Sequence, residues 1–288
     1  MERADESFDE VTMKREMLHA EGEGPALLAA GGASHPGRSR HRNEDAFEIV
    51  EARGLAVVSD GLGGHPAGDI ASRMTVDEIA SKSWEFDLDP TQPDGGENAP
   101  VGPLEVLRLC VQHANRTIHA AGVQYPVCAG MGATVAALLM VRGFVYIAHV
   151  GDSRVYRLRG RKLERLTEDH SRAAEYLRAH GKEADPAVRK RHEHTLTRCL
   201  GARAEVAVDL RAEKCELDDV YLLCSDGLWS VVDEKAIVRV LLSETDPGAA
   251  AEKLVDCANR AGGPDNVTVV VVKPAQLDGT ETTLPEED

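Results

Sequence analysis

With 288 residues, of which 42% are hydrophobic, the chain can form one large domain or two small ones around a substantial core. Its formal net charge of −16 disfavours nucleic acid as a partner, because phosphate backbones are bound by clustered lysines and arginines. No apolar run approaches the roughly 20 residues of a membrane span, so we expect no membrane segment and no secretory signal. The six cysteines contain no C-x-x-C pair, so we expect no disulfide framework and a reduced, cytoplasmic setting.

Both ends of the chain are polar and acidic. Residues 1–24 hold eight acidic and three basic groups, and residues 275–288 hold five acidic groups and no basic one. We expect both segments to be disordered tails, because they lack the apolar residues that would order them. The sequence therefore predicts a single folded domain over residues 25–274.

In chain order, that domain alternates short apolar runs with turn residues. The predicted strands are 26–30, 46–50, 55–58, 134–141, 144–150, 155–158, 206–210, 220–224 and 267–272, and the predicted helices are 68–83, 104–121, 171–180, 233–242 and 247–261. Arg142-Gly143 and Arg159-Gly160 are turn signals that favour antiparallel hairpins. A sandwich or mixed antiparallel architecture is therefore favoured over a doubly wound sheet.

Four aspartates stand beside apolar runs in glycine-containing turns: Asp60, Asp152, Asp226 and Asp265. A single Asp-Gly pair is usually only a turn, but four copies in similar settings weaken that interpretation. Buried carboxylates are costly unless hydrogen bonds or a cation compensate, and oxygen ligands select Mg²⁺ or Mn²⁺. The pattern predicts a site for divalent cations.

An arginine-rich segment precedes the second predicted strand and places Arg40 near Glu44 and Asp45. It can be a solvated charged loop, but a planar guanidinium also suits bidentate phosphate binding. A metal pair with an arginine nearby fits a phosphoester hydrolase that uses water and needs no covalent nucleophile.

Taken together and in this order, the motifs resemble the metal-dependent protein phosphatase family of the 2C type, particularly its compact bacterial members, over roughly residues 27–273. They are Arg40-x-x-x-Glu44-Asp45, Asp60-Gly61-Leu62-Gly63-Gly64-His65, Gly132-Ala133-Thr134, Gly151-Asp152-Ser153-Arg154, Leu196-Thr197-Arg198-x-Leu200-Gly201, Ser225-Asp226-Gly227-Leu228-Trp229 and Asp265-Asn266-Val267-Thr268. The resemblance implies an α+β fold in which a central sandwich of two antiparallel sheets is flanked by α-helices on both sides. It also implies a serine/threonine protein phosphatase that acts on phosphorylated proteins, opposes a Ser/Thr kinase and is a monomer.

The resemblance also implies roles for particular residues. Asp60 would bridge two core Mg²⁺ or Mn²⁺ ions, and the Gly61 carbonyl, Asp226 and Asp265 would be further ligands of these ions. Glu44 and Asp45 would hold waters on these metals, and Arg40 would bind the phosphate. Asp152, with Asp226, would bind a third, weaker ion.

Two features are left open by the resemblance. Leu62 stands where animal members carry a histidine thought to protonate the leaving group, and His65 is more simply a residue that packs or caps the turn before residue 68. Residues 171–194 match the variable flap of the family, which is either an exposed charged helix and loop or a selector of phosphopeptides. Neutralising Arg189, Lys190 and Arg191 tests the second possibility.

Other functions are compatible with parts of the sequence. A catalytically weak member acting as a binding module would usually lack a metal aspartate, and none of Asp60, Asp226 and Asp265 is missing. A nucleotide-binding turn at residues 61–64 lacks a following Gly-Lys-Ser/Thr, and Ser153 lacks a histidine partner in a recognisable context. Local hydrogen bonding at the sheet ends explains Ser153 and Thr134.

Overall fold

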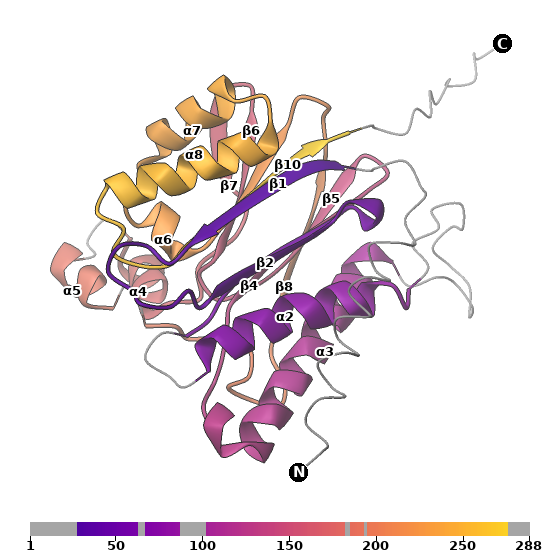
Figure 1. Ribbon diagram of the computed structural model, residues 1–288, viewed down its shortest axis with the longest axis vertical. Coiled ribbons are helices and arrows are strands. Elements are labelled where there is room, and N and C mark those ends of the chain that lie inside the picture. Colours follow the sequence, from indigo (N-terminus) through magenta and orange to yellow (C-terminus); the bar gives the residue numbers. More distant parts are fainter. Residues whose placement is uncertain (1–27, 63–66, 87–101, 182–184, 193–194, 276–288) are drawn as a thin grey trace.

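The computed structural model describes residues 28–62, 67–86, 102–181, 185–192 and 195–275, and it forms a sandwich of two five-stranded antiparallel sheets (Figure 1). The first sheet contains, in spatial order, β1 (Leu28–His35), β10 (Val267–Pro274), β9 (Val220–Cys224), β6 (Arg154–Arg159) and β7 (Lys162–Arg165). The second contains β2 (Asp45–Val50), β3 (Leu55–Asp60), β4 (Val135–Val141), β5 (Phe144–Val150) and β8 (Asp209–Lys214). Apart from residue 275, the predicted tails lie outside the described residues.

Two helix pairs complete four layers. The helices α2 (Gly68–Ser83) and α3 (Pro103–Gln124) cover the second sheet, and α7 (Glu234–Ser243) and α8 (Pro247–Arg260) cover the first. One apolar cluster fills the space between the sheets, and one lies under each helix pair. The predicted α+β sandwich with helices on both sides is therefore confirmed.

The remaining helices are short. They are η1 (Glu51–Arg53), η2 (Pro126–Cys128), α4 (Arg172–His180), α5 (Pro186–Arg191) and α6 (Asp226–Trp229). Figure 1 shows α4, α5 and α6 at the same end of the sandwich as the turn that follows β1. No helix in the described residues is long and apolar enough to span a membrane, and all six cysteines are free.

The two predicted hairpins are confirmed, since β4 pairs with β5 and β6 with β7. Some boundaries were wrong. The predicted strand 206–210 lies instead at β8, because Val206 and Val208 pack against the helix-covered core while residues 209–214, most of them charged, pair with β5. The sequence pattern also missed β7 and the single turn of α6, whose residues are charged or few.

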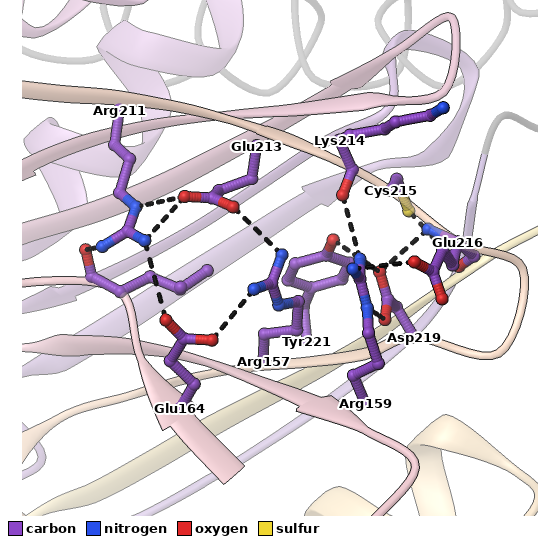
Figure 2. Close-up of polar contacts among 11 residues, drawn as sticks. Arg157, Arg159, Glu164, Arg211, Glu213, Lys214, Cys215, Glu216, Asp219 and Tyr221 are labelled. Carbon is purple, nitrogen blue, oxygen red and sulfur yellow. Dashed lines mark hydrogen bonds and ion pairs between the residues drawn. The ribbon is translucent and has the colours of Figure 1, made fainter. Parts of the chain in front are cut away.

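Ion pairs join the two sheets at the β7 and β8 edges (Figure 2). Arg157 of β6 donates to Glu164 of β7 at 2.9 Å and to Glu213 of β8 at 3.1 Å. Arg159 forms a two-pronged pair with the fully buried side chain of Asp219, both contacts at 2.7 Å. This fork-shaped pair is geometrically specific and ties β6 to the residue before β9 within the first sheet. Arg159 also donates to the Lys214 carbonyl of β8 at 3.0 Å, so Arg157 and Arg159 both connect the first sheet to the second.

Candidate metal centre

The sandwich places two carboxylates side by side at one end of the second sheet. Asp45 opens β2 and Asp60 closes β3, and the two are direct partners in the antiparallel register. The backbone of Asp60 is fixed on both sides by Thr134, which accepts from its N–H through Oγ1 at 3.0 Å and donates to its carbonyl at 2.8 Å. The hairpin between β2 and β3 therefore brings together two acidic side chains that the sequence separates.

The charges around Asp60 come from distant parts of the chain. Burial raises the pKa of Asp60 well above its usual range, and the carboxylates of Asp45, Asp226, Asp152 and Asp265 raise it further, in that order. The structure therefore brings all four predicted aspartates and Asp45 into one electrostatic cluster. Like charges in one site favour a proton or a cation.

Asp45 is buried and only partly satisfied. Its Oδ2 accepts a hydrogen bond from Ser225 Oγ at 2.7 Å, whereas Oδ1 is buried without a hydrogen-bond partner. Burial raises the pKa of Asp45 to about 7, and Asp226 adds to the shift, although the Ser225 hydrogen bond opposes it. An orphaned carboxylate oxygen beside other carboxylates fits a hard divalent cation and its waters.

The segment between β1 and β2 is wrapped around residues 265–266. Asn266 Oδ1 accepts from the Glu44 N–H at 2.8 Å, and its Nδ2 donates to the carbonyls of Pro36 and Arg42 at 2.9 and 2.8 Å. Gly37 has a φ of +79°, and a Cβ there would lie 2.1 Å from the Asp265 carbonyl oxygen. Asn266 therefore holds Glu44 and the arginine-rich segment next to the aspartates, a role that the sequence did not reveal.

Arg40 and Asp265 are paired with each other. Arg40 Nη2 donates to Asp265 Oδ2 at 2.9 Å, with 44% and 31% of the two side chains exposed. The hydrogen bond and charge of Asp265 raise the pKa of Arg40. Ion pairs this exposed are weak, so either partner can exchange the other for a ligand at little cost.

Gly61 and Glu44 lie in close contact. The Gly61 N–H donates to the Glu44 carbonyl at 3.0 Å, and a Cβ on Gly61 would lie 2.1 Å from the Gly68 carbonyl oxygen, so no larger residue fits. Burial raises the pKa of Glu44, and Arg40 opposes that shift. Leu62 follows with its N–H bonded to the Gly132 carbonyl at 2.9 Å, whereas His65 lies outside the described residues.

Asp152 and Asp226 sit on two other turns at this end. Asp152 is 5% exposed and lies after Gly151, whose φ of +108° brings it against Thr134. Ser153 Oγ is 2.6 Å from Thr134 Oγ1, which confirms the expected local hydrogen bonding of these two hydroxyls. Asp226 begins α6.

Flap residues lie beside these turns. The side chain of Ser171 caps α4 by accepting from the Ala174 N–H at 3.2 Å, and Ser171 pairs with Leu196. Arg189 and Lys190 lie in α5, but their side chains are not among the described parts of the structure.

Among residues 28–62, 67–86, 102–181, 185–192 and 195–275, no three His, Cys, Asp or Glu side chains already form a metal cage. Asp265 is turned to Arg40, with which it pairs at 2.9 Å. The ligand role of each aspartate accordingly stays a prediction. The oxygen-only donor set nevertheless suits Mg²⁺ or Mn²⁺ rather than zinc.

Comparison with known proteins places the chain among phosphatases. The family model described as protein phosphatase 2C matches residues 31–257. The serine/threonine phosphatase Stp of Listeria monocytogenes is 36% identical over 240 residues, which are 82% of this chain and 92% of that protein.

Solved structures agree with this. The Mycobacterium tuberculosis serine/threonine phosphatase PstP is 32% identical with a TM-score of 0.73, over 86% of this chain and 99% of that one. The catalytic domain of PstP, solved in complex with two manganese ions, has a TM-score of 0.72 at the same identity and coverage.

Proposed function

The chain belongs to the protein phosphatase 2C family and is a serine/threonine protein phosphatase, and we propose that it uses a pair of Mg²⁺ or Mn²⁺ ions. Asp60, the Gly61 carbonyl, Asp226 and Asp265 would hold the two core ions. The observation that supports this most is the single cluster in which four other carboxylates raise the pKa of Asp60.

The remaining acidic residues complete the proposed centre. Glu44 and Asp45 would hold water next to the core ions, and Asp152 with Asp226 would hold a third, weaker ion. When bound, the cations supply positive charge for the phosphoryl oxygens and make water a better nucleophile. The orphaned Oδ1 of Asp45 would gain the partner that it lacks.

Arg40 would bind the phosphate of the substrate. Its guanidinium faces Asp265, and a phosphate can replace that carboxylate because a guanidinium forms bidentate pairs with either anion. The same exchange would release Asp265 toward a cation. Phosphate and cation would therefore each favour separation of the Arg40–Asp265 pair.

The substrates are phosphorylated proteins, as for the related phosphatases. We propose that the enzyme acts as a monomer, opposes a Ser/Thr kinase and selects its targets through residues 171–194. Leu62 has an apolar side chain and supplies no proton, so another group would protonate the leaving serine or threonine.

A metal titration tests the proposal. The protein is stripped with a chelator, and hydrolysis of a phosphothreonine peptide is followed as Mn²⁺ or Mg²⁺ is added. We expect no turnover without metal and saturable turnover with it. Asp246→Asn is the matched control for aspartate variants, because Asp246 is an exposed helix N-cap for which asparagine serves equally well. Peptide binding without turnover at any metal concentration would favour a binding module instead.

A further inference from the structure

The backbone around Asp152 is held by two side chains outside its own turn. The Gly151 N–H donates to His170 Nδ1 at 2.9 Å, and the Gly151 carbonyl accepts from the His170 N–H at 2.7 Å. The Asp152 carbonyl accepts from Trp229 Nε1 at 3.1 Å. The indole thus reaches Asp152 from α6.

Trp229 and Asp226 are the last and first residues of the single turn α6. Residues three apart in a helix lie on the same face, so Asp226 and Trp229 share one face of this turn. The indole is itself clamped, because the Arg154 guanidinium lies 3.5 Å from its ring centre and pairs with Asp169 at 2.9 and 2.6 Å. Trp229 therefore links the turn that carries Asp226 rigidly to the backbone of Asp152.

We propose that Trp229 is a positioning residue that sets the spacing of the Asp152 and Asp226 carboxylates. This inference rests on the proposed function, in which these two aspartates hold the weaker third cation. Two carboxylates repel each other unless a cation lies between them, so a fixed tether that keeps them close raises the affinity for that cation. Removing the indole N–H also leaves a backbone carbonyl without its donor.

The chain supplies a matched control for this role. Its two tryptophans each lie under an arginine: Trp229 under Arg154 at 3.5 Å and Trp84 under Arg53 at 5.0 Å. The Nε1 of Trp84 is buried without a hydrogen-bond partner, whereas that of Trp229 donates to Asp152. Trp229→Phe and Trp84→Phe therefore remove the same atoms from similar settings, but only the first breaks the contact with Asp152.

The experiment measures Mn²⁺ binding to the wild type and to both variants after each has been stripped with a chelator. Binding is followed without substrate, by calorimetry and by the electron paramagnetic resonance signal of free Mn²⁺. In Trp229→Phe we expect the weakest class of Mn²⁺ sites to lose about fivefold to tenfold in affinity, the worth of one hydrogen bond, with the tight class unchanged. Hydrolysis of a small aryl phosphate should then need correspondingly more Mn²⁺, with turnover recovered at saturation. Trp84→Phe should match the wild type in both assays.

Several outcomes overturn the proposal. Equal Mn²⁺ affinities in Trp229→Phe and Trp84→Phe would overturn it. An equal loss of affinity in the weak and tight Mn²⁺ sites of Trp229→Phe, together with a lower urea midpoint, would also overturn it, because that result marks a purely structural role. If Trp229→Phe does not fold, Asp169→Asn loosens Arg154 while keeping the indole. It should weaken the same class about twofold to threefold, and equality with Trp84→Phe would again refute the idea. If the wild-type protein neither binds Mn²⁺ nor hydrolyses substrate, the proposed function is refuted together with the role of Trp229. If the wild type is active and the Trp229 variant behaves like it, only the proposed role of Trp229 is refuted.

Discussion

Replacing Asp45 by asparagine should stabilise the metal-free protein at alkaline pH. Burial raises the pKa of Asp45 from 3.8 to about 7 in the folded chain. Folding therefore favours the protonated carboxyl, and the stability it contributes is complete below about pH 4 and lost as the pH rises through about 7. The three-unit gap corresponds to about 4 kcal/mol of unfolding free energy at pH 8.

Asparagine cannot ionise, and its side-chain oxygen can still accept the hydrogen bond from Ser225 Oγ that Asp45 accepts at 2.7 Å. We therefore expect Asp45→Asn to exceed the wild type by roughly 2–4 kcal/mol at pH 8 in excess chelator and to match it near pH 4. Saturating Mn²⁺ should reverse the order, because a ligand that binds the folded state stabilises it and the variant binds it less well.

Urea unfolding followed by tryptophan fluorescence measures both effects. Asp246→Asn, an exposed N-cap variant, is the control, and its unfolding free energy should follow that of the wild type at every pH and Mn²⁺ concentration. An Asp45→Asn protein that is no more stable than the wild type at pH 8 in chelator would show that the Asp45 carboxyl is not held in a charge-disfavouring site.

Three further predictions concern the site and its surroundings. Asp60→Asn or Asp226→Asn should lower kcat/KM a hundredfold or more while peptide binding persists, and near-normal turnover in either would remove that residue from the centre. Arg40→Ala should mainly raise KM for a phosphopeptide, and unchanged kinetics would exclude Arg40 from phosphate binding. Burial lowers the pKa of His149 to about 3, so the folded protein disfavours the charged imidazole and loses stability as the pH falls below about 6.5. The unfolding free energy of His149→Leu, measured relative to that of the wild type, should therefore rise by about 2 kcal/mol when the pH is lowered from 8 to 5. Parallel pH profiles of the two unfolding free energies would refute this.

Asp60, Asp152, Asp226 and Asp265 could be singled out from the sequence because each stands beside an apolar run in a glycine-containing turn, a local pattern. Their partners could not be. Arg40 meets Asp265 across 225 positions, and Ser225 meets Asp45 across 180, contacts that only the folded sheets create. The tryptophan contact with the Asp152 carbonyl depends on a single helical turn, which carries too few residues to produce a periodic signal.

The fold shows the same division. The buried strands were predicted from continuous apolar residues, whereas β7 and β8 carry charges on both sides of the strand. Their stabilisation comes from ion pairs with a different strand, such as those that Arg157 makes, and composition does not reveal these pairs. Conversely, Val206 misled the strand prediction because it packs under a helix rather than within a sheet.

The ion pairs at the β7 and β8 margins also bear on aggregation. An edge strand normally offers unpaired backbone groups on which a neighbouring molecule can add its own strand. Here charged side chains of both edge strands are already paired with Arg157, so an incoming strand would meet a charged margin rather than a flat apolar one. These margins should therefore resist intermolecular sheet growth in dilute buffer and become more permissive as salt screens the charges.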